Sequence, residues 1–529
     1  MDDSDMKKKF YIFIISSICI SLILIVGTGC IHKKVYNENV RDYLVYNVDS
    51  LPEDLLLVSD NNIRKQDLNL CLFEGLVSFD KEGKTIPALA SEWKISSDKL
   101  TYTFNIRENA MWSNGDKIVA KDFEDFFSRI LKEKNNIYRR QLECIFGVKD
   151  YINNDADFSR VAISSKDEEK LEIRLNYPCE DFLKILGEPA FTLKRNFYNL
   201  RNWKSEYRKI NYSGAFIIDN IYDNGEISLL KNDKYWDKDS VISKKVHIKN
   251  KETTAFALAD YNSNSIDVFC NDDITELSDI PKSEKLKKTL TNKGVSLNFN
   301  LNKDGFARDI KFRKAIKYAV NRENIEKSLN GLFTKSYRYL PEEIKKNVSI
   351  NYQANLVKAK EFLNNSGYGG ETVEVVYSNG SDNNKKIVNS ILKDLESLKI
   401  KAEAKGYDKE ELKNIVDNDK YDIIIKDYKG EYNSSLCYLE KWVSSNKFNV
   451  YGYRNVKFDN AVLKGKVSID KAQSNTNYKN AEDILLEDIP IIPLGFYDFV
   501  LCKKSYVEGI EINNMGNIII KKSHIKNKK

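Results

Sequence analysis

Strands and helices alternate along residues 371–428, and this alternation strongly limits the folds that the chain can adopt. Residues 371–378 (ETVEVVYS) have the pattern of a strand, 385–400 (KKIVNSILKDLESLKI) of a helix, and 401–407 (KAEAKGY) of a second strand. Residues 421–428 (YDIIIKDY) carry three consecutive isoleucines, which is typical of a buried strand. Strands that alternate with helices predict α/β domains with largely parallel strand pairing.

Four further segments have clear periodicity. Residues 99–107 alternate apolar and polar side chains and predict a strand, whereas residues 120–131 place phenylalanines at helical spacing. Residues 312–329 predict one continuous helix, and residues 354–370 predict a helix with Leu356, Ala359 and Phe362 facing inward, ending at Asn365 and Gly367. The apolar face of each segment needs a hydrophobic partner, so all four segments belong to packed domains.

The start of the helix at residues 120–131 lacks an ordinary capping residue. Val119 stands where the side chain of Ser, Thr, Asp or Asn would accept a hydrogen bond from the first turn. We expect Asp116 or Asp122 to take over this role.

The chain is too long for a single core. Its 529 residues predict two or three domains, and since no low-complexity linker separates them, we expect the domains to interrupt one another in sequence. The formal charge of +6 is small and spread out, apart from a basic tail at residues 521–529. Without a basic stripe or a reading motif, the sequence gives no sign of nucleic-acid binding.

Cysteine and histidine usage argues against metal and hydrolase chemistry. The eight cysteines form no CxxC pair, and the six after Cys30 are mostly flanked by apolar residues, which predicts buried free thiols. The three histidines lie far apart, which disfavours a His-ligated metal site or a His-based triad. Residues 82–85 (EGKT) lack the preceding glycine of a phosphate-binding loop. We therefore expect no cofactor, no resident metal and no enzymatic activity.

The N-terminus has the layout of an export signal. Lysines at 7–9 precede an apolar run at 10–26, then small residues at 27–29 lead to Cys30. This resembles a bacterial lipobox, in which signal peptidase II cuts before a cysteine that carries diacylglycerol, although Gly27 stands where Leu is usual. The alternative is an uncleaved anchor helix, since 17 apolar residues are at the lower limit for a membrane span. Both alternatives place the later residues outside, tethered to the membrane.

Six blocks of sequence, in order, resemble the peptide/nickel (family 5) solute-binding proteins of ABC transporters. The first is LFEGLVSFDKEGKTIPALASEWKISSDKLTYTFNIRENAMWSNGDKIVAKDF at 72–123. The others are at 214–237 (GAFIIDNIYDNGEISLLKNDKYWD), 300–325 (NLNKDGFARDIKFRKAIKYAVNRENI), 359–368 (AKEFLNNSGY), 449–462 (NVYGYRNVKFDNAV) and 482–496 (EDILLEDIPIIPLGF). Each block alone is weak, but six in this order are specific, and the oligopeptide-binding branch is closest in pattern.

The resemblance implies a periplasmic-binding-protein type II-like α/β fold, bilobal with a hinge, with mixed sheets flanked by helices in three domains. The implied lobes close over an oligopeptide and deliver it to an ABC permease and ATPase complex. It implies an extracytoplasmic monomer, held at the cell membrane by lipid on Cys30. The expected boundaries are 1–29 for the signal peptide, 30–48 for the tether, 49–85 with 209–298 and 505–522 for the lobe I core domain, 86–208 for an additional lobe I domain, and 299–504 for lobe II.

The resemblance also implies ligand-binding residues after the strand at 421–428. In peptide-binding members an aspartate in a Trp-x-x-Asp-Tyr stretch receives the ligand's α-amino group, because an ammonium taken out of water needs a charged partner. Glu431 occupies that position here, Tyr428 stands at the Trp position, and Tyr432 and Asn433 complete the segment. Asp427 competes with Glu431 for this role, and an exposed loop acid is the alternative for Glu431.

Four more residues are implied to contact the ligand. Tyr138 falls where the family brings a tyrosine to the ligand, with ordinary packing as the alternative. Asn298 and Asn300 are expected to offer their amide groups to the peptide backbone. The alternative is that both side chains form hydrogen bonds within the hinge itself. Lys426 is a candidate for the ligand carboxylate, although the family's basic residue lies one position earlier, at Ile425 in this chain.

Three other functions stay open at this point. A member of the same family could bind nickel, a metal chelate, haem or another small solute. A peptide sensor could use the same closure without feeding transport. A secreted hydrolase is disfavoured, because no nucleophile and base pair is visible.

Overall fold

The computed structural model describes residues 41–58, 62–251, 253–271, 280–329, 332–341, 354–430, 432, 434–513 and 515–526. Within it, Tyr43–Lys526 form one compact unit. Because this unit is not divided further, the predicted domain boundaries stay predictions. Among the described residues, no helix has both the length and the apolar character needed to cross a membrane.

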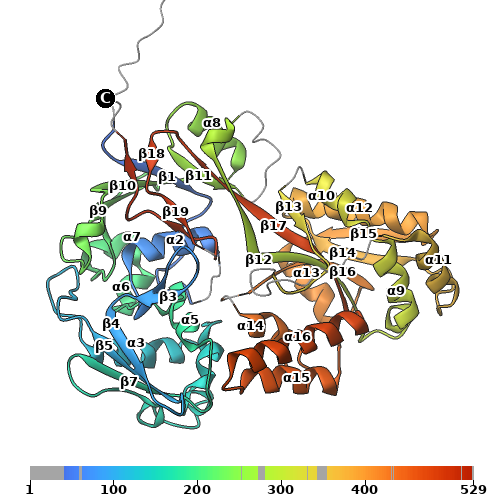
Figure 1. Cartoon of the computed structure of the whole chain (residues 1–529). Helices are drawn as coiled ribbons and strands as arrows, with labels where there is room; N and C mark the ends of the chain where they lie inside the picture. Colours follow the sequence, from blue (N-terminus) through green and yellow to red (C-terminus); the bar gives the residue numbers. More distant parts are fainter. Residues whose placement is uncertain are drawn as a thin grey trace, which may run out of the picture. The chain divides into compact units, whose positions relative to one another are not determined.

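An eleven-stranded mixed sheet runs through the described chain (Figure 1). Its order is β15-β14-β16-β12-β17-β11-β1-β10-β9-β8, and β13 pairs with β17. The strands are β1 (Leu44–Val48), β8 (Phe216–Ile221), β9 (Ile227–Lys231), β10 (Lys245–Asn250), β11 (Val268–Asn271), β12 (Lys285–Phe299), β13 (Phe333–Lys335), β14 (Val373–Ser378), β15 (Ala402–Tyr407), β16 (Ile423–Lys429) and β17 (Ile491–Lys503).

Two long strands, β12 and β17, join the two ends of this sheet. Strand β17 pairs with β12 at both of its ends, its C-terminal end also pairs with β11, and β12 pairs with β16 on its other edge (Figure 1). These pairings are antiparallel, whereas β14 with β15 and β16, and β1 with β10 and β11, are parallel. The expected parallel pairing is therefore confirmed for the strands of residues 371–428, but it is wrong for the sheet as a whole, because β12 and β17 run antiparallel to their neighbours.

A second, antiparallel sheet has the order β4-β5-β7-β6. Its strands are β4 (Ala90–Ile95), β5 (Thr101–Ile106), β6 (Ile163–Ser165) and β7 (Lys170–Arg174). The alternation predicted for residues 99–107 is confirmed, since Tyr102, Phe104 and Ile106 are buried. Helix α3 (Ala120–Lys132) is confirmed as well and buries its phenylalanines. Asp122, rather than Asp116, helps to cap α3, because its Oδ2 accepts a 2.9 Å hydrogen bond from Val119 N.

The helix predicted at 312–329 is two helices, α9 (Ile310–Ala319) and α10 (Arg322–Ser328). The break lies at Val320 and Asn321, where the backbone is extended. Asn321 caps α10 through its side chain, which accepts hydrogen bonds from Glu323 N and Asn324 N. The capping residue Asn321 therefore divides a segment of continuous apolar periodicity into two helices.

Helix α11 (Leu356–Asn364) ends as predicted, at Asn365, but only part of its expected inner face is buried. Ala359 is fully buried, and Phe362 stacks on Tyr318 with ring centroids 5.6 Å apart. Leu356, in contrast, is 42% exposed. The prediction that Leu356 faces inward is wrong, because α11 packs through Ala359 and leaves Leu356 exposed.

The remaining elements are short or cover the sheets. The helices are α2 (Ile63–Leu72), α4 (Val148–Ile152), α5 (Phe182–Leu186), α6 (Phe197–Arg201), α7 (Trp203–Glu206), α8 (Thr254–Asn262), α12 (Asp382–Ser397), α13 (Lys409–Asp417), α14 (Ser435–Leu439), α15 (Val456–Lys466) and α16 (Lys471–Asp488). The short strands are β2 (Val77–Phe79), β3 (Thr85–Pro87), β18 (Val507–Glu508), β19 (Glu511–Ile512), β20 (Ile518–Ile519) and β21 (His524–Ile525).

The described cysteines agree with the predicted free thiols. Cys71, Cys144, Cys179, Cys437 and Cys502 are buried, Cys270 is partly buried, and none of these six described cysteines forms a disulfide.

Candidate functional site

A cavity of about 460 Å³ lies beside the middle of the large sheet. Residues of β12, β16 and β17 form one wall, and Asp49, Asn62, Ile63 and Arg64 from the segment after β1 and the start of α2 form another. Tyr339, Lys441, Trp442, Phe448 and Tyr451 from connecting segments close its sides.

Strand periodicity explains which side chains of β12 and β16 reach the cavity. The register pairs Ser296 with Lys426 and Gly294 with Tyr428, so these side chains share one face with Asn298. Leu297 and Ile425 point to the opposite face and are buried in a hydrophobic core. One face of the strand pair therefore stabilises the fold, and the other presents polar and aromatic groups to the cavity.

Three buried polar side chains form a chain of hydrogen bonds along this face. Ser296 Oγ donates to Asn298 Oδ1 at 3.0 Å, and Asn298 Nδ2 donates to the Tyr451 hydroxyl at 3.2 Å. The side chain of Asn298 is thus held in one orientation, and its second amide hydrogen and the Tyr451 hydroxyl remain as groups that a ligand can reach.

Aromatic rings form the side of the cavity next to these polar groups. The ring of Tyr428 lies 4.5 Å from that of Tyr339, and its hydroxyl donates to Tyr339 O at 3.0 Å. Trp442 stacks on Tyr451 with centroids 4.9 Å apart. Burial raises the pKa of Tyr428 well above its usual value, so its hydroxyl stays a neutral donor. Such a wall can pack against apolar or extended groups of a ligand.

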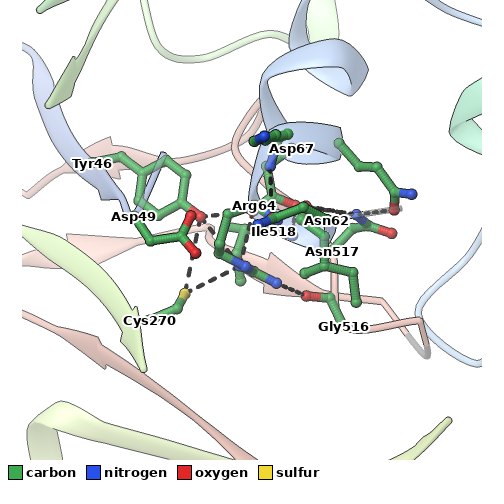
Figure 2. A network of polar contacts seen from close by, with 12 residues as sticks. Tyr46, Asp49, Asn62, Arg64, Asp67, Cys270, Gly516, Asn517 and Ile518 are labelled. Atoms are coloured by element: carbon green, nitrogen blue, oxygen red, sulfur yellow. Dashed lines mark hydrogen bonds and ion pairs between the residues drawn. The ribbon is translucent and has the colours of Figure 1, made fainter. Parts of the chain in front are cut away.

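Arg64 lines the second wall of the cavity, and Figure 2 shows the polar contacts that surround it. Its guanidinium pairs with Asp67 at 2.8 Å, donates to the Tyr46 hydroxyl at 3.2 Å, and lies 4.9 Å from the centre of the Phe499 ring. Asp67 also accepts from Tyr46 and from Ile518 N, at 2.6 and 2.9 Å. Burial raises the pKa of Asp67 to about 6 in spite of these donors. The network fixes Arg64 at the cavity wall.

The predicted site residues fall into three groups: those that line the cavity, those outside the described residues, and those that are buried away from the cavity. Tyr428, Asn298 and Lys426 line the cavity, as does Asp427, the alternative to Glu431. Glu431 and Asn433 lie outside the described residues, as does Cys30.

Tyr138, Asn300 and Tyr432 are buried and do not line the cavity. Tyr138 packs edge-on against Phe191 with centroids 6.4 Å apart. Asn300 donates to Tyr421 O at 3.1 Å and accepts from Asn302 N at 3.0 Å. These positions agree with the packing alternatives for Tyr138 and Asn300.

Several lining residues were not predicted, among them Arg64, Ser296, Tyr339, Trp442 and Tyr451. The signal for Ser296 was available, because it lies two residues before Asn298 and so shares its strand face. Arg64, Trp442 and Tyr451 come from distant segments that only the tertiary structure brings together.

The described residues include no group of three or more His, Cys, Asp or Glu side chains arranged to hold a metal ion. What the cavity offers is hydrogen-bonding groups, aromatic surface and charged side chains. This chemistry is suited to binding.

Comparison with known proteins decides the family. Residues 84–450 match the family model described as bacterial extracellular solute-binding proteins, family 5 Middle. The chain belongs to this family. It is 27% identical over 489 residues to the dipeptide-binding protein DppE of Bacillus subtilis, covering 87% of this chain and 88% of DppE. It is 25% identical over 502 residues to the periplasmic oligopeptide-binding protein OppA of Salmonella typhimurium, covering 90% of each chain.

The fold comparison agrees with this assignment. The structure of the Escherichia coli murein tripeptide-binding protein MppA superposes with a TM-score of 0.77 at 21% identity, covering 92% of this chain and 99% of MppA. The predicted bilobal, type II-like mixed α/β fold of a family 5 solute-binding protein is therefore confirmed. The members of this family are extracellular solute-binding proteins, and the chain is a binding protein and not an enzyme.

Proposed function

We propose that this protein captures oligopeptides outside the cell, held to the membrane by lipid on Cys30, and delivers them to an ABC importer. The observation that carries the proposal is the cavity face of β12 and β16, where Ser296, Asn298 and Tyr451 hold fixed hydrogen-bonding groups beside an aromatic wall. An extended peptide needs backbone partners together with tolerant side-chain pockets. The peptide-binding relatives, which match along most of the chain, point to the same ligand class.

In this proposal Glu431 receives the ligand's α-amino group. Asp427 is less suited to the role, because its Oδ1 already accepts from the Tyr497 hydroxyl at 3.1 Å and its Oδ2 lies 3.9 Å from Lys293 Nζ. A carboxylate with these partners has less capacity left for an ammonium.

Calorimetry with matched peptides tests the amine anchor. The Glu431→Gln variant should bind a free-amine peptide about ten- to a hundredfold more weakly, the loss expected for a hydrogen bond to a charged group. Binding of the N-acetylated peptide should change little, and Glu431→Asp should retain most of the affinity. Equal affinity of Glu431→Gln and wild type for the free-amine peptide would refute the role of Glu431. A loss seen only with Asp427→Asn would assign the anchor to Asp427.

The lipid anchor is tested separately. Mass spectrometry of the N-terminus is expected to show cleavage before Cys30 and a lipid-modified cysteine, and globomycin or Cys30→Ala should block processing. An intact N-terminus would favour the uncleaved anchor helix.

A further inference from the structure

Two parts of the chain meet at a place away from the long strands that join them. The part before β12 and the part between β12 and β17 are connected through these two strands. At a separate place, the segment that leads into α5 meets the start of α14 (Figure 1). There the Ser434 hydroxyl donates a hydrogen bond to Asp181 Oδ2, although the two residues are 253 positions apart in sequence.

Both side chains of this hydrogen bond are buried, and each is held by its own element. Asp181 is 8% exposed and Ser434 is 5% exposed. Asp181 Oδ1 accepts from Lys184 Nζ of α5 at 2.9 Å. Ser434 Oγ accepts from Leu436 N at 3.2 Å and so caps α14. The cap occupies the oxygen and leaves the hydroxyl hydrogen for Asp181, which gives a charge-assisted hydrogen bond.

Two further contacts lie between the same two parts of the chain. Lys466 Nζ of α15 lies 5.7 Å from the centre of the Tyr177 ring, in the segment before α5. Lys99 Nζ, in the turn between β4 and β5, donates to Ile469 O at 2.8 Å. The boundary between the two parts is therefore made by several elements on each side.

Polar contacts of this kind suit a boundary that opens and closes. A carboxylate, a hydroxyl, an ammonium and a carbonyl can all bind water when the two parts separate, so the net cost of opening is modest. Interfaces between domains of one chain are more polar than permanent interfaces, and relative motion is expected across them. One hydrogen bond to a charged group is then enough to shift the balance between closed and open forms by about tenfold.

The α14 end of the contact leads directly to the cavity. The short helical turn after α14 carries Trp442 into the cavity lining. Tyr438 of α14 packs edge-on against Tyr428, another lining residue, with ring centroids 6.2 Å apart. Asp181 is not among the described residues that line the cavity. By binding Ser434, however, it holds the element that carries part of the aromatic wall.

We propose that the hydrogen bond between Asp181 and Ser434 is a clasp that holds the two parts of the chain together over a bound peptide and slows its release. This inference rests on the proposed function and adds the residues that set the lifetime of the complex. Asp181 is a positioning residue, since it acts on the ligand through Ser434 and α14. The clasp must break before the peptide leaves, whereas entry into the open form does not require it, so its effect falls on the dissociation rate.

Stopped-flow kinetics with one fluorescent pentapeptide measures this effect. The labelled peptide, which has a free amino group, is bound to the purified protein and displaced by an excess of unlabelled peptide. Asp181→Ala and Ser434→Ala should each raise the dissociation rate about tenfold and change the association rate by less than about threefold. Since both variants remove the same hydrogen bond, the double variant should release the peptide about as fast as either single variant.

Three controls separate the clasp from a general loss of structure. Ser434→Thr keeps the hydroxyl and should retain the dissociation rate of the wild type. Asp181→Ala leaves the Ser434 cap of α14 in place, so an effect that it shares with Ser434→Ala does not come from the cap. Asp155→Ala removes a carboxylate from an exposed position in the same part of the chain and should change neither rate.

The possible outcomes separate this inference from peptide capture. If the wild type bound no peptide, capture and the clasp that serves it would both fail. If peptide bound and left the wild type, Asp181→Ala and Ser434→Ala at the same rate, capture would stand and the clasp would be overturned. Multiplied effects in the double variant would also overturn it, because two independent causes would then act. A lower free energy of unfolding with unchanged dissociation would assign the hydrogen bond to folding stability alone.

Discussion

Replacing the buried Lys194 by Met is expected to stabilise the protein at neutral pH. Lys194 is 2% exposed, and its Nζ donates to Thr192 Oγ1 at 2.7 Å and to Thr192 O at 3.2 Å. Its ammonium also lies 5.2 Å from the centre of the Phe73 ring. Burial lowers its pKa from 10.5 to about 7, because these contacts do not replace the lost hydration.

The sign of the pH dependence follows from this shift. Between about pH 7 and 10.5 the unfolded chain binds a proton at Lys194 that the folded chain has lost, so the free energy of unfolding rises with pH. A difference of one proton changes this free energy by at most about 1.4 kcal/mol per pH unit. Lys194 should therefore make the wild type about 2 kcal/mol more stable at pH 9 than at pH 7.

Lys194→Met removes the buried ammonium and keeps most of the side-chain volume. Thr192 Oγ1 stays satisfied, since it accepts from Asn69 Nδ2 at 2.9 Å and donates to Pro189 O at 2.8 Å. The variant should therefore be more stable than wild type at pH 7, and the difference should shrink by about 2 kcal/mol at pH 9.

Urea unfolding at pH 7, 8 and 9 measures these free energies. Lys84→Met, at an exposed position, is the control for losing a lysine and should follow the wild type. If Lys194→Met shows the same rise in the free energy of unfolding with pH as the wild type, Lys194 is not the source of this pH dependence.

Three more predictions concern the stability of the fold. Asn321→Ala should destabilise the protein by about 1 kcal/mol in urea unfolding, because two N–H groups of α10 lose their cap, whereas Asn321→Asp should restore most of it. Arg64→Met leaves Asp67 buried without its cation and should cost about 3–5 kcal/mol. Since this change raises the pKa of Asp67 above about 6, the loss should be larger at pH 8 than at pH 5, and a loss independent of pH would contradict the account. Gly147→Ala should lower the melting temperature more than Gly225→Ala: both glycines have φ of +80°, but a Cβ at Gly147 would lie 2.2 Å from Arg160 O, whereas nothing lies within 4 Å at Gly225. Equal decreases of the melting temperature in the two variants would mean that the positive φ alone, and not the clash with Arg160 O, determines the loss of stability.

Local pattern predicted those elements whose own side chains determine them. The alternation of Tyr102, Phe104 and Ile106 identified β5, and the phenylalanines of 120–131 identified α3. The break at Asn321 was missed, although an Asn followed by charged residues is a capping signal that the apolar periodicity outweighed. The antiparallel pairings of β12 and β17 were also missed, since they join residues some 200 positions apart in sequence, as Asn298 with Ile491.

The residues of the candidate site could likewise be predicted only in part. Asn298 was found because it lies next to a block that resembles the family, and Lys426 and Tyr428 because they fall where the family's ligand-binding stretch follows a buried strand; strand periodicity puts all three on one face. Arg64 and Trp442 could not be predicted, because they reach the cavity from distant segments through tertiary packing. Sequence position alone also could not show that Asn300, two residues after Asn298, uses its side chain for hydrogen bonds with the backbone of Tyr421 and Asn302.

Native mass spectrometry of the mature soluble chain, purified without denaturation, tests the central claim most directly. Adducts are expected whose released ligands fragment as peptides, at one peptide per chain. A single non-peptide ligand such as haem or a metal chelate would contradict peptide capture.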